Sequence, residues 1–223
     1  MNTPNHAKTF CPAPLAILSA AAACAIAGCS DPADKAAKTT AIEPKQIAQP
    51  TANAKDYILH AESKIEFVGS KVTGSHAGGF KRIAGRVSVA NGVVGAAEVK
   101  IDMDSTWSDT ERLTEHLKSP DFFDVAKYPT ANFTASSIAA SNAQHRVIGN
   151  LSLHGITKSI SFPAEIQVAD DVVTVKSEFA INRKDFNINY PGKPNDLIRD
   201  NVVLNLDIKA TPGEPRPQYQ LTN

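Results

Sequence analysis

A strict alternation of apolar and polar residues at positions 97–104 constrains the fold of this chain more than any other stretch. The apolar positions are Ala97, Val99, Ile101 and Met103, and the polar ones are Glu98, Lys100, Asp102 and Asp104. Successive side chains of a β-strand point to opposite faces of a sheet, so a period of two predicts a strand with one dry face. Similar alternation recurs between Tyr57 and Ile208, and the sequence therefore predicts an all-β domain.

About eight such strands, joined by short polar connections, predict an antiparallel sheet whose dry faces meet one another. A sandwich and a closed barrel both satisfy this requirement. A barrel leaves no exposed edge strands, and eight strands enclose an interior just wide enough for side chains or for one slender ligand. The alternation alone does not choose between the two architectures.

One segment between the strands has a helical pattern instead. Ser108 fits the first position of a capping box, and Leu113 and Leu117 lie four residues apart on one face. Phe122 and Phe123 follow and predict a large apolar wedge, which must insert into a sheet or barrel. We expect a helix of about three turns that covers the barrel.

The chain begins with the features of an export signal. After Lys8 comes an Ala-rich apolar run of about fifteen residues, which is typical of a signal peptide and too short for a membrane span. The tetrapeptide Ile-Ala-Gly-Cys at 26–29 resembles the bacterial lipobox, where the chain is cut before the cysteine and the thiol is acylated. We therefore expect residues 1–28 to be a lipoprotein signal peptide, with an ordinary signal peptide as the alternative. The resemblance implies membrane attachment through acylated Cys29 and, from Ser30, a periplasm-facing position in the cell envelope at the outer membrane.

Composition divides the rest of the chain. All three cysteines lie at or before position 29, so the mature chain cannot form an internal disulfide. Residues 29–54 contain few large apolar side chains and predict a flexible tether. We expect a barrel domain over 55–212 and a C-terminal tail over 213–223. The chain has 23 basic and 23 acidic residues and no basic stripe, which argues against binding to nucleic acid.

Four segments carry a resemblance to a known family. They are GSHAGGFKRIAG (74–85), HLKSPDFFDVAKYPTANF (116–133), GNLSLHGITKSISF (149–162) and FAINRKDF (179–186). In this order and spacing they resemble the YceI-like family of exported polyisoprenoid-binding proteins. The resemblance implies an eight-stranded antiparallel lipocalin-like barrel with one short helix insertion. It also implies that the lumen holds a long apolar lipid, typically an isoprenoid or the tail of a quinone.

The candidate ligand-binding residues are the large apolar side chains expected on the inward face of the barrel and on its helix. They are Phe67, Phe80, Trp107, Leu113, Leu117, Phe122, Phe123, Phe133, Phe162, Phe179 and Phe186. The alternative is a filled core in which these rings pack against one another. Burying about 500 Å² of a lipid tail at ~25 cal/mol/Å² contributes on the order of 12 kcal/mol before ordering costs, which suffices for tight binding.

A second group of residues is polar and is expected near the mouth of the barrel. It consists of His76, Arg112, His116, Arg183, Asp185 and Arg199. Arg183 and Asp185, two apart on a predicted strand, are expected to form an ion pair. The histidines, including His154 in a predicted hairpin turn, are too dispersed to predict a metal site.

The sequence offers no catalytic residues that we can assign. The mature chain contains no free thiol, no Gly-x-Ser-x-Gly motif and no paired acidic motif at a strand end, so we expect no catalysis. No cofactor is required, although a bound isoprenoid lipid or quinone fits the pattern, and a homodimer is compatible with it. The expected function is a carrier or store of such a lipid. Two alternatives stay open: a protein-interaction module that uses the rim loop at 190–200, and a hydrolase or redox enzyme.

Overall fold

The computed structural model describes residues 31–141 and 144–213. The predicted signal peptide, the acylation site Cys29 and residues 214–223 of the predicted C-terminal tail lie outside the described residues.

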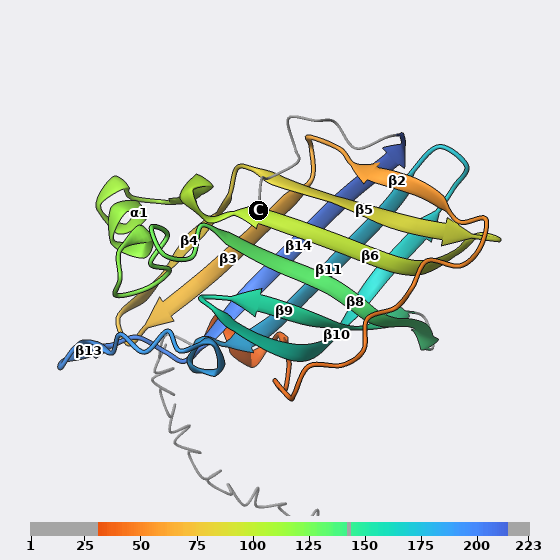
Figure 1. Ribbon diagram of the computed structural model, residues 1–223. Coiled ribbons are helices and arrows are strands. Elements are labelled where there is room, and N and C mark those ends of the chain that lie inside the picture. The colour runs from red at the N-terminus through yellow and green to blue at the C-terminus, as the bar shows by residue number, and fades with distance from the viewer. Residues whose placement is uncertain (1–30, 142–143, 214–223) are drawn as a thin grey trace, which may run out of the picture.

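Eight antiparallel strands of the described chain close into a barrel, which confirms the architecture that the resemblance implied (Figure 1). The ring closes at β14 (Asn201–Pro212), which pairs with β11 (Val173–Asn182) along one edge. At its C-terminal end the other edge of β14 pairs with β2 (Lys55–Leu59). The remaining strands of the ring are β5 (Ile83–Ala90), β6 (Val93–Asp102), β8 (Thr130–Ser141), β9 (Gln144–Leu153) and β10 (Ile156–Val168).

Additional elements cover one end of the barrel, which we call the helix end. Here β14 exchanges β2 for β3 as its neighbour, and β3 continues the sheet through β4 and β7. These strands are β3 (Lys64–Lys71), β4 (Gly74–Phe80) and β7 (Thr106–Ser108). The other elements are η2 (Met103–Ser105), α1 (Glu111–Lys118), η3 (Arg183–Phe186), β12 (Gly192–Lys193) and β13 (Asp196–Leu197).

The predicted helix exists, but its N-terminus differs from the prediction. The N-cap is Thr110, whose hydroxyl accepts a hydrogen bond of 3.3 Å from the amide of Leu113. The predicted capping box at Ser108 is wrong, because Ser108 pairs with Gly78 as part of β7 and is held in extended conformation. The helix is therefore eight residues long, which is little more than two turns.

Two hairpins turn through residues with left-handed backbone. Asn91 and Gly92 have φ values of 52° and 75°, and His154 and Gly155 have values of 50° and 75°. Glycine and asparagine adopt this conformation at low cost, so the Asn-Gly signal led to the correct hairpin. His154, predicted as a turn residue, also lies near the carbonyl oxygen of Phe186, with 3.1 Å between Nδ1 and O.

Residues 31–48, which we call the docked segment, differ from the flexible tether that the composition predicted. The strands β10 and β11 pair with each other only from Glu165 onward and diverge before it. Within the split, β1 (Ala37–Lys38) pairs with β11, and Ile42 bridges to Ser159 of β10. The prediction of a flexible tether is therefore wrong for this segment. Composition does not reveal backbone pairing, because such pairing needs no large apolar side chains. Figure 1 shows the segment running along the outside of the barrel.

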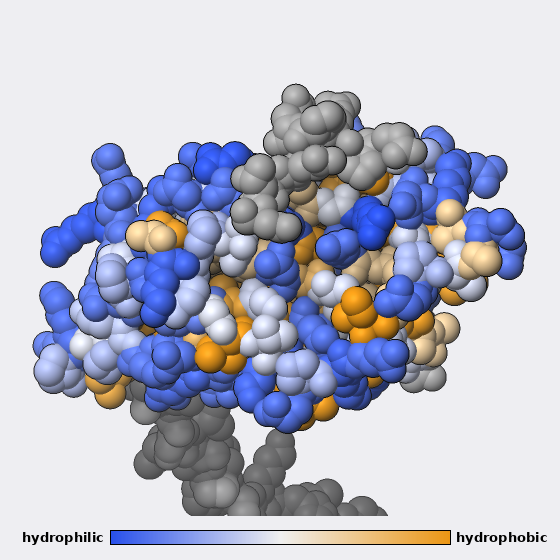
Figure 2. All heavy atoms as spheres, viewed as in Figure 1, coloured by the Kyte–Doolittle hydropathy of each residue, from blue (hydrophilic) through white to orange (hydrophobic). Residues whose placement is uncertain are grey.

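The outer surface follows the alternation of the strands. Figure 2 shows mainly hydrophilic side chains over the visible face of the barrel, with hydrophobic ones in small areas between them. No helix among the described residues has the length and apolarity needed to cross a membrane.

Candidate functional site

An apolar cavity of about 120 Å³ lies in the middle of the barrel. Ala97, Val99 and Ile101 of β6 line it, as the alternation in the sequence predicted. Phe133 of the neighbouring strand β8 and Phe162 of β10 also line it, and every lining residue is apolar. The cavity therefore offers a ligand only hydrocarbon contacts.

A second cavity of about 140 Å³ lies at the helix end. Leu117, Phe122 and Phe123 form part of its wall, so the predicted apolar wedge does insert into the barrel. The two cavities share four lining residues, which are Ile65, Ile101, Leu151 and Leu204. Because the same side chains line both, the cavities adjoin each other inside the barrel, and we call the two together the lumen.

Several inward-facing side chains show that the interior is hollow. Ile101, Leu204 and Leu206 point into the barrel and line the middle cavity, yet they are only half-buried. Side chains of a filled core are almost completely covered by their neighbours. The predicted alternative of a fully packed core is therefore wrong for this part of the barrel.

Glycines across from the lining aromatic rings keep the rings flat against the wall. A Cβ atom on Gly149 would lie 2.3 Å from Cζ of Phe133, and one on Gly78 would lie 2.4 Å from Cζ of Phe67. Any larger residue would push either ring towards the lumen. Our sequence analysis missed these glycines, although a glycine within a strand pattern is a signal for close approach of another group.

The aromatic side chains form two groups along the lumen. In the middle, Phe162 and Phe179 stack with ring centroids 4.2 Å apart and planes 7° from parallel. At the helix end, Phe67, Phe80 and Phe123 form a triangle with centroid distances of 5.8 to 6.4 Å. Tilted and edge-to-face arrangements of this kind are favourable contacts between aromatic rings.

The structure places eight of the eleven candidate lining residues on the lumen. At the helix end these are Phe67, Phe80, Leu117, Phe122 and Phe123. In the middle they are Phe133, Phe162 and Phe179. Trp107 lies instead on β7 beside Gly79, and Leu113 packs against the helix-end cluster without lining the cavity. Phe186 is fully buried in a dry cluster. These three side chains, on β7, α1 and η3, therefore do not line either cavity.

Arg183 is the only charged side chain among the described residues that line the two cavities. It is 4 % exposed, and its guanidinium donates hydrogen bonds to the carbonyl oxygens of Ile188, Ile198 and Arg199 at 2.6, 3.3 and 3.1 Å. Burial lowers the pKa of Arg183, and the charge of Asp200 opposes this shift. The guanidinium is thus a fixed polar group at the helix end of an apolar lumen.

The expected ion pair between Arg183 and Asp185 is wrong. Arg183 pairs with Asp200, with 3.5 Å between Nη2 and Oδ1. Residues 183–186 form the 3-10 helix η3 rather than a strand, and Asp185 is exposed. The assumption that residues two apart point to the same side holds only for a strand.

The other predicted mouth residues do not line the lumen. His76 lies 3.0 Å from Asp109, and His116 lies 2.8 Å from Asp121. Arg112 is exposed on α1. Arg199 is held at 3.8 Å from the carboxylate of Asp31 in the docked segment. The six residues that the sequence grouped at one mouth therefore lie at the helix end, but only Arg183 reaches the cavity.

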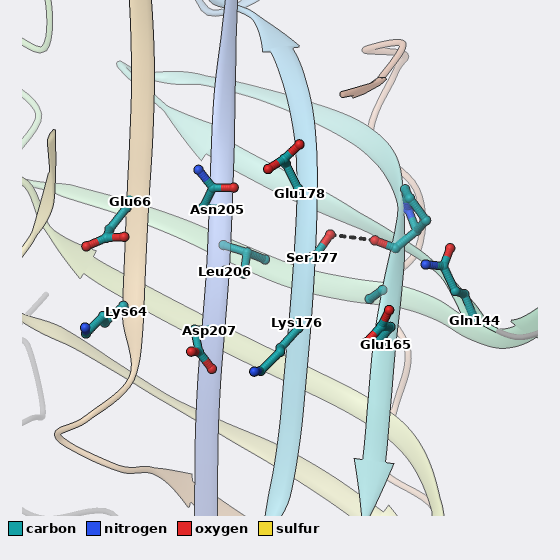
Figure 3. A pocket seen from close by; sticks show the side chains of 12 residues that line it. Lys64, Glu66, Gln144, Glu165, Lys176, Ser177, Glu178, Asn205, Leu206 and Asp207 are labelled. Atoms are coloured by element: carbon teal, nitrogen blue, oxygen red, sulfur yellow. Dashed lines mark hydrogen bonds between the residues drawn. The ribbon is translucent and has the colours of Figure 1, made fainter. Parts of the chain in front are cut away.

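A larger hollow of about 440 Å³ lies on the outside of the barrel and is polar (Figure 3). Its walls come from β3, β14, β11 and β10, and Figure 3 shows Lys64, Glu66, Lys176, Glu178 and Asp207 around it. An open surface of charged groups gives a hydrocarbon chain no favourable contact. The described residues also contain no group of three or more His, Cys, Asp or Glu side chains that could hold a metal. The internal lumen is therefore the candidate site.

A closed antiparallel barrel around an apolar lumen defines a lipocalin-like protein. Within that class, residues 57–210 match the YceI-like domain, and the chain belongs to this family.

Relatives and solved structures agree with this placement. Protein YceI of Escherichia coli O157:H7 is 31 % identical over 152 residues, which cover 62 % of this chain and 78 % of that protein. The crystal structure of Burkholderia cenocepacia BcnA matches with a TM-score of 0.63 and 24 % identity, over 68 % of this chain and 98 % of that one. A polyisoprenoid binding domain from Saccharophagus degradans, implicated in plant cell wall breakdown, matches with a TM-score of 0.60 and 18 % identity, over 72 % and 100 %. At these identities the two structures establish the fold.

Proposed function

We propose that this protein binds one long apolar lipid of the polyisoprenoid or isoprenoid-quinone type in its lumen, without catalysis. The observation that carries the proposal is a pair of adjoining apolar cavities inside the barrel, which share the lining residues Ile65, Ile101, Leu151 and Leu204. Membership of the YceI-like family supports it, and one structural relative is described as a polyisoprenoid binding domain.

The size of the cavities sets a condition on binding. Each is slightly smaller than an apolar cavity of about 150 Å³ that accommodates one benzene molecule. A long isoprenoid therefore occupies the lumen only if lining side chains change rotamer and the two spaces merge further. Burial of the tail at roughly 25 cal/mol/Å² provides the free energy for this rearrangement. A thin chain is favoured over a compact ring system because each of the two cavities is small.

The polar end of the ligand belongs at the helix end. Arg183 is the one charged group on the lumen wall there, and three carbonyl oxygens hold its guanidinium in place. A fixed donor binds a carbonyl or phosphate oxygen with little further loss of side-chain entropy. We therefore place the tail in the middle cavity and the head group near Arg183.

The cellular setting is part of the proposal. Residues 1–28 act as a lipoprotein signal peptide, and acylated Cys29 holds the barrel at the periplasmic face of the outer membrane. In this position the protein serves as a carrier or store for a lipid that is insoluble in water.

Mass spectrometry of organic extracts tests the proposal. The full chain, expressed with its own signal segment and purified gently, is expected to release a long-chain isoprenoid lipid in a stoichiometric amount. In the variant Ala97→Phe, a new ring enters the middle cavity, and lipid content is expected to fall at least about fivefold because the added volume blocks the chain.

The matched control is Ala139→Phe, which adds the same ring at an exposed position of β8. Its lipid content is expected to equal that of the wild type. An empty wild-type lumen would contradict the proposal and favour the interaction module at 190–200 instead. Equal loss in both variants would mean that the effect is not specific to the lumen.

A further inference from the structure

The docked segment joins the barrel firmly at its first described residue. The carboxylate of Asp31 accepts a hydrogen bond of 3.2 Å from the hydroxyl of Ser70 and lies 3.8 Å from the guanidinium of Arg199. Two residues later, Ala33 is completely buried against the outer faces of β11 and β14, where it contacts Ala180 and Val203. The chain therefore reaches the barrel at the helix end, beside the tips of β3 and β14.

This attachment leaves only a short connection to the proposed lipid anchor. Cys29 precedes Asp31 by two residues. Two residues span at most about 7 Å even when fully extended. Acyl chains on Cys29 consequently hold the helix end of the barrel at the surface of the bilayer, whereas a flexible tether over 29–54 would have allowed any orientation.

The surface next to this attachment carries two exposed apolar side chains. Val72 in the turn after β3 is 55 % exposed, and Leu197 of β13 is 50 % exposed. The amide of Val72 donates a hydrogen bond of 3.2 Å to the carbonyl oxygen of Leu197, so the two residues are neighbours. Val72 lies two residues beyond Ser70, and Leu197 two residues before Arg199, the same residues that hold Asp31. We call Val72 and Leu197 the apolar tip.

Three ion pairs lie around the apolar tip, whereas Lys193 of β12 is exposed and has no ion-pair partner among the described residues. Lys71 bonds to Asp196, Lys184 lies 3.0 Å from Asp200, and Arg199 faces Asp31. Paired charges give little net attraction to anionic lipid and a single unpaired lysine adds only a little, so contact with a membrane here depends mainly on the apolar side chains.

We propose that the apolar tip inserts into the lipid bilayer and that the helix end of the lumen faces the membrane. The inference rests on the proposed acylation of Cys29, which keeps the tip at a high effective concentration near the lipid. Ile198 follows Leu197 directly and lines the helix-end cavity, so the wall of the lumen adjoins the inserted surface. A lipid can then pass between bilayer and lumen without crossing water.

Site-specific fluorescence quenching tests this orientation. The variants Val72→Cys and Val93→Cys place one free thiol each on an exposed valine, because the thiol of Cys29 is acylated. Val93 is 64 % exposed and begins β6, at the end of the barrel opposite the helix end. The acylated full chain carries a thiol-linked fluorophore and is reconstituted in phosphatidylcholine vesicles that contain a lipid with a quencher in the upper acyl chain.

Quenching at position 72 is expected to exceed quenching at position 93 by about threefold or more, since inserted groups reach the boundary of head groups and acyl chains. Leu197→Asp in the Val72→Cys background is expected to reduce quenching to the level of position 93. Added salt or phosphatidylglycerol is expected to change it little.

Equal quenching at the two positions would overturn the proposal, as would failure of the chain to float with the vesicles. Lipid content of the same samples, measured by mass spectrometry, separates this proposal from the proposed function. An occupied lumen with equal quenching contradicts only the docking. An empty lumen with selective quenching at position 72 supports the docking and contradicts only lipid storage.

Discussion

The middle of the lumen and its helix end reach the same apolar character by different means. The middle is built from alternate residues of regular strands, such as Val99 and Ile101 of β6. The helix end combines α1, η3 and the segment at 188–198, which come from distant parts of the sequence. The middle therefore depends on the local patterning of its strands, whereas the helix end depends on a few polar contacts between separate segments that centre on Arg183.

The largest effect is expected at the helix end, when Arg183 is replaced by methionine. The change removes the donor for three carbonyl oxygens, of which that of Ile188 is buried and those of Ile198 and Arg199 are partly buried. We expect the free energy of unfolding to fall by about 3 kcal/mol, measured by urea denaturation. The control Arg146→Met changes an exposed arginine of β9, and a change below about 0.5 kcal/mol is expected there. A similar small loss at Arg183 would show that its contacts do not hold the helix end together.

Replacement of Gly149 by alanine tests the middle of the lumen. The new methyl group would lie 2.3 Å from Phe133 and must push its ring into the cavity. We expect a loss of about 2 kcal/mol in stability together with reduced lipid content.

The matched control for this glycine is Gly74→Ala, because no heavy atom lies within 4 Å of the added methyl group. Its stability and lipid content are expected to stay at the wild-type level. Unchanged lipid content in Gly149→Ala, with the expected loss of stability, would show that the ring moves elsewhere than into the lumen.

Acid pH is expected to have the smallest effect, confined to the β12–β13 hairpin at the helix end. The hydrogen bond from Lys71 lowers the pKa of Asp196. The stabilisation by this pair is therefore present above the pKa of the unfolded chain and is lost as the pH falls through the lowered value. Hydrogen exchange of hairpin amides should accelerate in that range relative to amides of the β9–β10 hairpin. The variant Asp196→Asn should abolish the pH dependence, and its persistence would assign it to another group.

The difference between the middle of the lumen and its helix end also explains which features could be predicted from the sequence. The alternation at 97–103 predicted the inward residues of β6 correctly, because period-two patterning is local. The pairing of Arg183 with Asp200, the N-cap at Thr110 and the flat rings over Gly149 all depend on elements that meet only in the folded chain. The docked segment was missed for another reason. Part of its attachment is backbone pairing, which does not depend on residue type, and its side-chain contacts, such as those of Asp31 and Ala33, are made with residues far away in the sequence.

Photolabelling with an isoprenoid that carries a diazirine along its tail tests the central claim most directly. The label is expected on peptides that contain Val99, Ile101 and Leu204, whose side chains line the lumen. Excess unlabelled isoprenoid should suppress it, and Ala97→Phe should reduce it. Labelling of the outer polar hollow around Lys64 and Lys176, or no saturable labelling at all, would contradict the account.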